Sequence, residues 1–189
     1  MSRDRASQRG QSIVEFTLVL PVMLILLLAI VDVARIYTTM MSVESAAREA
    51  ADYGTTLGAG KWQAGLPATT TVTEMERRSC VAAADLPDYA DPDGNPQNGG
   101  CTNPSFSYCV RTSVGAPCAA LDPAASCDDP LRNPPCIVTV TLSYDFHLLA
   151  PLNFQFMGTS YGFPSTLSFS RDSSFAMTDI DLAPTAPGP

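Results

Sequence analysis

The longest apolar stretch of the chain lies near its N-terminus. Residues 16–31 form sixteen consecutive positions without a charge, and Ile13 and Val14 extend the apolar character to nineteen positions that only Glu15 interrupts. A helix needs about 20 predominantly apolar residues to cross a hydrocarbon core about 30 Å thick. The pattern therefore predicts one membrane-spanning helix, with its membrane part over about residues 13–31.

Beyond this run the apolar residues recur at helical spacing. They follow one another at intervals of about three or four residues, and charged residues fill the remaining surface, as in an amphipathic helix. We predict one long helix over residues 11–53 that starts near Ser12 and stops at Gly54. Its second half must pack on an exported domain or on a neighbouring subunit. The apolar positions of this half are Val33, Ile36, Met40, Val43, Ala47 and Ala50.

Pro21 lies inside the predicted helix. Because proline lacks a backbone N–H, a kink or local loosening is expected near Thr17. The Thr17 hydroxyl is expected to bond the carbonyl that Pro21 leaves without a donor.

The second half of the chain alternates between apolar and polar residues in three places. This period of two predicts half-buried strands over residues 106–114, over 138–146, and from 167 to 173 or as far as 177. The last two strands are expected to pair as antiparallel neighbours, with the long helix covering their apolar face.

One short helix is predicted before these strands. Thr73 and Glu76 have the spacing of a capping box, and the helix that they open would end near Asp85 with Met75, Ala82 and Ala83 on one face. A strand over residues 69–75, where β-branched residues are dense, is the alternative.

The flanking charges give the helix a direction. Arg3, Arg5 and Arg9 precede the apolar run with only Asp4 against them, so the N-terminus stays in the cytoplasm and the rest of the chain is exported. The whole chain has a net charge of −8, and without residues 1–10 eight basic residues face eighteen acidic ones, a net charge of −10. Such a surface repels phosphates and argues against a nucleic-acid partner.

All six cysteines lie downstream of the membrane run. An even number confined to the exported part predicts up to three disulfides, whose pairing the sequence leaves open among fifteen possibilities. A zinc site is the alternative, but no CxxC spacing exists and His147 is the only histidine, so we expect no metal and no cofactor. The cysteines are Cys80, Cys101, Cys109, Cys118, Cys127 and Cys136.

These elements predict an α+β protein with a single-pass N-terminal transmembrane helix that continues as a long amphipathic helix and packs on a small, disulfide-stapled domain containing β-strands. The expected parts are a cytoplasmic leader over residues 1–10, the long helix over 11–53, the exported domain over 54–182 with a cysteine-rich insertion over 80–136, and a flexible tail over 183–189.

Glu15 is a carboxylate in an apolar segment, which costs roughly 2.5–3.5 kcal/mol at the centre of a membrane helix and less near the interface. If the chain were cut after Gly10, Gln11 would carry a new α-amino group one helical turn from Glu15, about 6 Å along the axis. The ammonium and the carboxylate would then lie at matching depths, within one chain or between neighbours. Each group would offset the cost of the other.

These residues resemble a known processing signal. Gly10, followed by Glu15 and Phe16 and by an apolar helix that Pro21 interrupts, resembles the class III signal of type IV pilin-like proteins, in which a prepilin peptidase cuts after the glycine. The wider run over residues 9–16, with Leu20, Pro21 and residues 45–51, is similar to the TadE-like family of the tight-adherence (Flp) pilus system.

The resemblance implies a minor pilin or pseudopilin of a tight-adherence pilus or related secretion apparatus. Its implied partners are the prepilin peptidase, other pilin-like subunits and the assembly platform. Its implied location is the bacterial inner membrane, with possible incorporation into a surface pilus involved in cell adhesion. The resemblance also implies that Gly10 and Gln11 form the processing site and that Glu15, Phe16 and Pro21 take part in assembly.

Three alternatives remain open from the sequence. The chain could be a membrane-anchored, adhesin-like binding domain without a role in pilus assembly, or a structural envelope protein in which Gly10 stays uncut. It could also be a secreted protein with an ordinary signal peptide cut after a residue such as Ala47, but the apolar run exceeds the usual 7–15 residues and contains Glu15.

No stretch of the sequence predicts catalysis. Residues 91–95 begin like a calcium loop, but Pro96 and Thr102 stand where its glycine and bidentate glutamate belong, so an ordinary polar turn is favoured. Asp145 and His147 lack a nucleophile at a known spacing. We expect no enzymatic activity and no catalytic residue.

Overall fold

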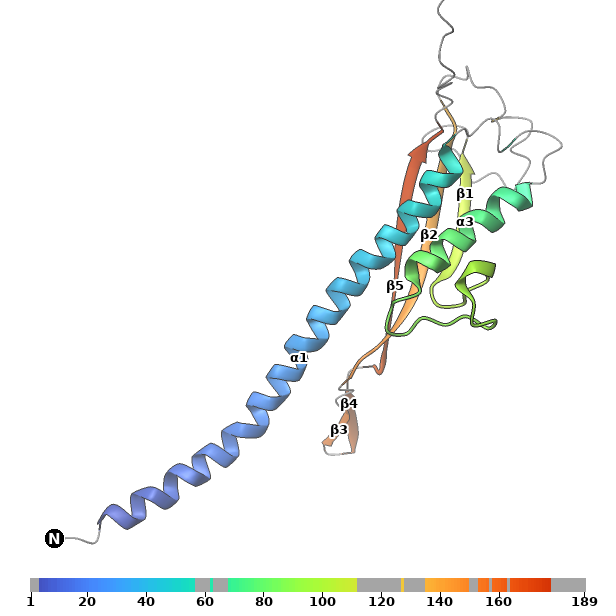
Figure 1. Cartoon of the computed structure of the whole chain (residues 1–189). Helices are drawn as coiled ribbons and strands as arrows, with labels where there is room; N and C mark the ends of the chain where they lie inside the picture. The colour runs from blue at the N-terminus through green and yellow to red at the C-terminus, as the bar shows by residue number, and fades with distance from the viewer. Residues whose placement is uncertain are drawn as a thin grey trace, which may run out of the picture. The chain divides into compact units, whose positions relative to one another are not determined.

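A computed structural model describes residues 4–56, 62, 68–111, 127, 135–149, 153–156, 158–162 and 164–177. Its long helix and its sheet make it an α+β protein, as predicted (Figure 1). The elements are the helices α1 (Asp4–Thr55) and α3 (Ala68–Ala83), the 3-10 turn η1 (Pro96–Asn98), and the strands β1 (Ser105–Arg111), β2 (Ile137–His147), β3 (Asn153–Phe156), β4 (Thr159–Gly162) and β5 (Thr166–Ala176).

The chain divides into two compact units. The first contains Met1–Thr38 and His147–Leu167, and the second contains Thr39–Phe146 and Ser168–Pro189. The predicted tail over residues 183–189 lies outside the described residues.

The core of the second unit is a three-stranded sheet in the order β1-β2-β5. The central strand β2 has the alternation that the sequence predicted, and every apolar residue of that pattern is at most 1% exposed: Val138, Val140, Leu142, Tyr144 and Phe146. β1 pairs antiparallel to β2, with Val110 opposite Val138. β5 lies on the other side of β2, so the predicted pairing of the last two strands is confirmed.

Small residues bring the end of α1 close to this sheet. Ala46, Ala47, Ala50 and Ala51 are all completely buried. Figure 1 shows the last turns of α1 and the helix α3 in front of the three strands. A face of alanines adds little bulk between helix and strand, so the two backbones approach closely. Of the predicted apolar stripe, Val43, Ala47 and Ala50 are buried, whereas Val33, in the first unit, is 66% exposed.

Gly54 has a different role from the predicted one. We expected it to stop the helix, but α1 continues to Thr55. A Cβ atom at position 54 would lie 2.8 Å from the Sδ atom of Met75 in α3 and 3.3 Å from Cγ1 of Val138 in β2. The carbonyl of Gly54 also accepts a hydrogen bond from Nε1 of the buried Trp62, at 2.9 Å. A side chain at this position would therefore require the end of the Met75 side chain to move.

A helix in this region is confirmed and the alternative strand is wrong, since α3 covers Ala68–Ala83. The predicted capping box is wrong, because the helix begins five residues before Thr73, so Thr73 and Glu76 lie inside it. Met75, Ser79, Cys80 and Ala83 are completely buried, at helical spacing. Ala82 was placed on the same face and is exposed instead. The buried face of α3 thus runs through Ser79 and Cys80.

The first unit contains two departures from the predicted elements. α1 begins at Asp4 and not near Ser12, because the arginine, alanine and glutamine residues around position 6 favour helix and a single glycine costs only about 1 kcal/mol. The segment between β2 and β5, for which no element was predicted, contains a hairpin in which β3 pairs antiparallel to β4.

We predict that Gly54→Val lowers the free energy of unfolding by about 1–3 kcal/mol, since the added carbons overlap Met75 and Val138. Urea unfolding in detergent, followed by the fluorescence of Trp62, the only tryptophan, measures the change. Ser45→Val, at an exposed position of the same helix, is the matched control and should shift stability by no more than about 0.5 kcal/mol.

The contact with Met75 can be isolated by adding Met75→Ala to Gly54→Val. The double variant should lose less stability than the sum of the single variants, because the smaller side chain makes room for the larger one. Strictly additive losses would contradict the proposed overlap.

Candidate functional site

The residues expected to direct processing and assembly lie in the first half of α1. Gly10 and Gln11 are helical positions of α1, and Gln11 precedes Glu15 by four residues, about one turn of the helix. Glu15 is exposed, and Phe16 is 63% exposed. The helix therefore places position 11 and Glu15 on the same side of one rigid element.

The apolar run of α1 is exposed along its whole length. Its large apolar side chains from Ile13 to Val31 are between 42% and 69% exposed. Ser12–Thr55 is the one helix among the described residues that is long and apolar enough to span a membrane. A water-facing surface of this size would be unusual for a soluble protein, so the run requires a lipid or protein environment.

α1 passes through Pro21 without a break in the helix. The Thr17 hydroxyl donates a hydrogen bond to the carbonyl of Val14 at 2.9 Å. We predicted that this hydroxyl would bond the carbonyl freed by Pro21, which is that of Thr17 itself. That prediction is wrong, because a threonine hydroxyl in a helix reaches back to the preceding turn.

Asp32 ends the apolar run and is the buried acidic residue of α1. Its Oδ1 atom accepts a hydrogen bond from the backbone N–H of Leu149 at 3.2 Å and lies 3.4 Å from NH1 of Arg35. These contacts connect the anchor helix to the segment that follows β2, within the first unit. No sequence pattern indicated these contacts, because Asp32 and Leu149 are 117 positions apart.

In the second unit, Arg78 connects α3 to the end of α1. Its NH1 atom lies 2.9 Å from a carboxylate oxygen of Glu49, and its Nε atom lies 3.0 Å from Glu74. The guanidinium also lies 4.4 Å from the centre of the Tyr53 ring, a cation–π distance. We call Glu49, Tyr53, Glu74 and Arg78 the Arg78 cluster. No sequence pattern links residues 49 and 78, and our sequence analysis missed this contact.

The carboxyl group of Glu74 has a strongly lowered pKa. Hydrogen bonds from Arg77, which binds both carboxylate oxygens at 2.7 Å, are the main reason that its pKa falls from 4.5 to about 2; Arg78 adds to the effect and burial opposes it. Glu74 is thus a firmly ionised structural anion and cannot serve as a general base near neutral pH.

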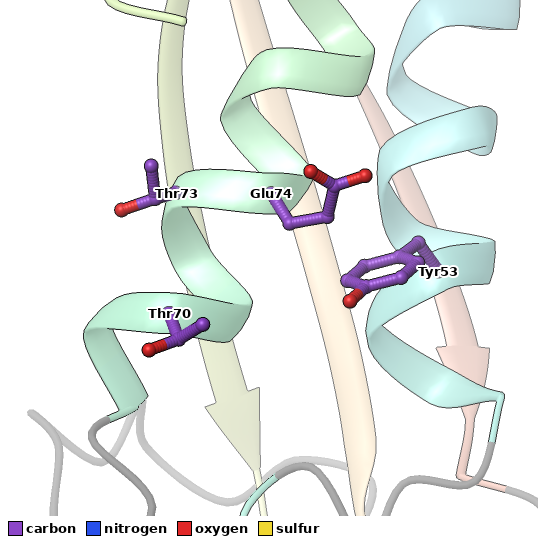
Figure 2. A pocket seen from close by; sticks show the side chains of 4 residues that line it. All are labelled: Tyr53, Thr70, Thr73 and Glu74. Atoms are coloured by element: carbon purple, nitrogen blue, oxygen red, sulfur yellow. The ribbon is translucent and has the colours of Figure 1, made fainter. Parts of the chain in front are cut away.

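A shallow groove of about 470 Å³ lies beside the Arg78 cluster, lined by Tyr53 of α1 and by Thr70, Thr73 and Glu74 of α3. Figure 2 shows Tyr53 of α1 pointing towards Glu74 of α3, with Thr70 and Thr73 nearer the start of α3. The carboxylate in this groove is already bonded to two arginines. The described residues that line the groove therefore offer hydroxyl groups, and the one carboxylate among them is already paired.

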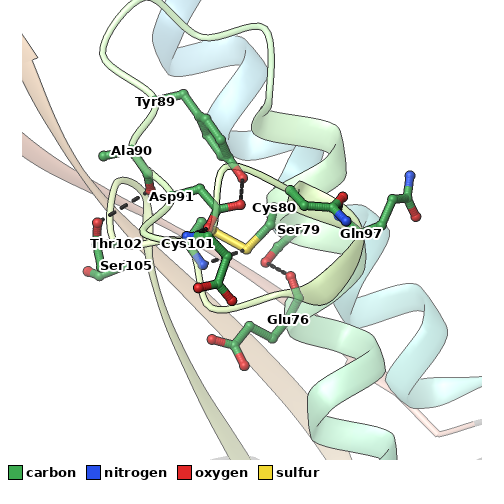
Figure 3. The surroundings of a disulfide bond; sticks show 12 residues. Glu76, Ser79, Cys80, Tyr89, Ala90, Asp91, Gln97, Cys101, Thr102 and Ser105 are labelled. Carbon is green, nitrogen blue, oxygen red and sulfur yellow. Dashed lines mark hydrogen bonds between the residues drawn. A yellow bond between two sulfur atoms is a disulfide. The ribbon is translucent and has the colours of Figure 1, made fainter.

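Two disulfides join cysteines that both lie within the described residues. Cys80 of α3 bonds Cys101, and Cys127 bonds Cys136 next to β2. Cys109 is also disulfide-bonded, and Cys118 lies outside the described residues. Figure 3 shows the Cys80–Cys101 bond between α3 and the loop before β1. Closing a chain of this length stabilises the fold by roughly 3 kcal/mol in the chain-entropy account.

Hydrogen bonds attach the same loop to the central strand. The Tyr144 hydroxyl of β2 accepts a bond from the backbone N–H of Asp88 at 2.9 Å. The Asn103 side chain donates to the carbonyls of Asp88 and Asp145 and accepts from the N–H of Asp145. The loop is therefore fixed at both ends despite its content of Pro, Gly, Asn and Asp.

The polar turn over residues 91–95 has the structure of ordinary turns. Asp91 accepts the N–H of Asp93, and Asn95 accepts the N–H of Gln97 to cap η1. Asp145 accepts a hydrogen bond from the hydroxyl of Ser168. Within the described ranges no group of three or more His, Cys, Asp or Glu residues could hold a metal ion.

Residues 10–52 match the family model described as TadE-like protein. The match begins at the expected processing glycine and ends in the part of α1 that packs on the sheet. The resemblance found in the sequence is therefore confirmed over this segment. No curated protein and no solved structure matches the chain.

The perturbed pKa of Glu74 predicts a pH-dependent stability. Because its pKa in the folded protein lies below the ordinary value, its contribution is present above about pH 4.5 and is lost as the pH falls towards 2. Glu74→Gln should therefore cost about 1 kcal/mol near pH 7, an amount limited by solvent screening of this partly exposed cluster. The difference from the parent chain should shrink below pH 4.5.

Urea unfolding of both chains between about pH 3 and pH 7, read by Trp62 fluorescence, tests this. Glu76→Gln is the matched control, since it removes the same charge from α3 outside the Arg78 cluster. A stability difference for Glu74→Gln that is the same at every pH would show that ionisation of Glu74 does not contribute.

Proposed function

We propose that this chain is a membrane-anchored minor pilin or pseudopilin of a tight-adherence pilus or related secretion apparatus. A prepilin peptidase cuts it after Gly10, and the new N-terminus at Gln11 enters an assembly of pilin-like helices. The N-terminus before cleavage lies in the cytoplasm, the α1 run lies in the inner membrane, and the second unit is exported. No catalytic role belongs to this proposal.

The observation that carries the proposal is the family match over residues 10–52 on one unbroken helix. The matched segment includes an exposed apolar run and, after it, the buried alanine face of α1. A segment with these two parts suits a subunit whose anchor is removed from lipid during assembly while its exported domain remains folded. Arg3, Arg5 and Arg9 support the orientation.

Glu15 guides the entry of the subunit into the assembly by pairing with a cationic group. A carboxylate at this depth in the anchor is costly without a cationic partner. After cleavage, the α-amino group of position 11 lies one turn away on the same helix, or belongs to the neighbouring chain packed alongside. Pairing with the amine of a neighbour would favour a fixed axial register between adjacent helices, because any other register separates the two charges.

We predict that Glu15→Ala leaves membrane insertion and cleavage intact and reduces association with the other pilin-like subunits about tenfold, equivalent to about 1.4 kcal/mol. The reason is loss of the carboxylate that pairs with the amine. The measurement is copurification of subunits from cells that carry the native apparatus, with the membrane content and N-terminus of the variant determined in the same samples.

Glu44→Ala is the matched control, because it removes a half-buried carboxylate, paired with Arg48, from α1 beyond the apolar run. Its copurification should equal that of the parent chain. Unchanged association of Glu15→Ala would refute the pairing. A free exported domain that binds surfaces without any other subunit would favour the adhesin-like alternative.

A further inference from the structure

One of the five asparagines of the chain, Asn98, is followed by glycine. Deamidation of an asparagine begins when the backbone nitrogen of the next residue attacks its Cγ atom, and a glycine such as Gly99 leaves that approach unhindered because it has no side chain. A fourth asparagine, Asn153, precedes the bulkier phenylalanine. The other three precede proline, whose nitrogen carries no proton and cannot close the ring: Asn95, Asn103 and Asn133. The sequence therefore favours position 98 for this chemistry.

The structure leaves Asn98 open to reaction. It is exposed, at the last position of η1. The N–H of Gly99, the attacking group, donates to the carbonyl of Pro96 at 3.4 Å, which is at the long end for a hydrogen bond. A 3-10 turn of three residues also contains few hydrogen bonds, so its opening costs little. The side chain of Asn95, by contrast, is bonded to the N–H of Gln97.

The residues on both sides of Asn98 attach η1 to the helix α3. Gln97 accepts a hydrogen bond from NH1 of Arg77 at 2.6 Å. Gly99 is buried, and a Cβ atom at its position would lie 3.4 Å from the backbone nitrogen of Arg77 and 3.5 Å from its Cα atom. Both contacts are made with one residue of α3, so they depend on the spacing between positions 97 and 99.

We propose that Asn98 is a site of spontaneous deamidation in the second unit. The nitrogen of Gly99 loses its proton and bonds to Cγ of Asn98, while the bond from Cγ to the side-chain nitrogen breaks and that nitrogen takes up a proton and leaves as ammonia. Water then opens the resulting succinimide at one of its two carbonyl carbons. The products are aspartate and isoaspartate, each with one additional negative charge, and no oxidant or reductant is consumed.

The two products differ in their effect on η1. Isoaspartate continues the chain through its side-chain carboxyl carbon, which adds one methylene group to the backbone between positions 98 and 99. Gln97 and Gly99 then lie too far apart along the chain for both to keep their contacts with Arg77. Aspartate leaves the backbone unchanged. Isoaspartate at position 98 therefore loosens η1 from α3, and aspartate does not.

The test is incubation of the full-length chain in detergent, in water labelled with heavy oxygen, followed by peptide mapping with mass spectrometry. The same incubation in urea gives the rate in the unfolded chain. Asn98→Gln is the matched control, because glutamine must close a larger ring. Fragment ions separate position 98 from Asp93, which also precedes a glycine but releases no ammonia.

At about pH 8, where more of the Gly99 nitrogen is deprotonated than at neutral pH, Asn98 should deamidate at least about tenfold faster than Asn153. Aspartate and isoaspartate should both form at position 98, each with one oxygen atom from the labelled water. The asparagines that precede proline should stay intact, and Asn98→Gln should give no product at this position.

Hydrogen exchange at the backbone N–H groups of residues 97 and 98 measures the loosening of η1. Exchange should be at least about threefold faster in the isoaspartyl chain than in the parent chain, because the turn opens more often. Asn98→Asp, which adds the charge without lengthening the backbone, should exchange at the rate of the parent chain.

Three results would contradict these expectations. Deamidation of Asn98 in urea but not in the folded chain would show that the turn protects this residue and would overturn the proposal. Formation of aspartate without isoaspartate would exclude the succinimide and overturn it as well. Isoaspartate at position 98 with unchanged hydrogen exchange would keep the modification site and overturn the loosening of η1.

Discussion

The fold of the second unit depends on the close approach of α1 to the central strand β2. Ala46, Ala47 and Ala50 are fully buried, and no side chain at Gly54 separates the helix from Met75 and Val138. A bulkier face would move the end of α1 away from the sheet and break the Arg78 contacts with Glu49 and Tyr53. The other half of the same helix is exposed and apolar.

Both halves contribute to the segment that matches the family model. Residues 10–52 satisfy two demands on a single backbone, a lipid-compatible surface and a narrow face for packing on a sheet. The segment after β2 is attached to α1 by the hydrogen bond from Leu149 to Asp32, within the first unit.

Periodic patterns allowed prediction of the anchor helix, of β2 and of the α+β class, because both helix and strand bury one face. The pattern could not give contacts between distant residues, such as Glu49 with Arg78 or Asp32 with Leu149, which depend on how the elements pack. Nor could it give the pairing of Cys80 with Cys101. The β3–β4 hairpin could have been predicted, since polar and aromatic residues alternate from Asn153 to Phe156 and Gly158 follows them, a residue that suits a tight turn. In the structure Gly158 has a φ of 77°.

The most direct test of the proposed pilin-like role is the intact mass and N-terminal peptide of the membrane-bound chain, expressed with its native prepilin peptidase and again without it. The account predicts an N-terminus at Gln11 only when the peptidase is present, and an N-terminus at or near Met1 when it is absent. An N-terminus near Met1 under both conditions would contradict processing at Gly10, and one beyond Ala47 would contradict the membrane anchor itself.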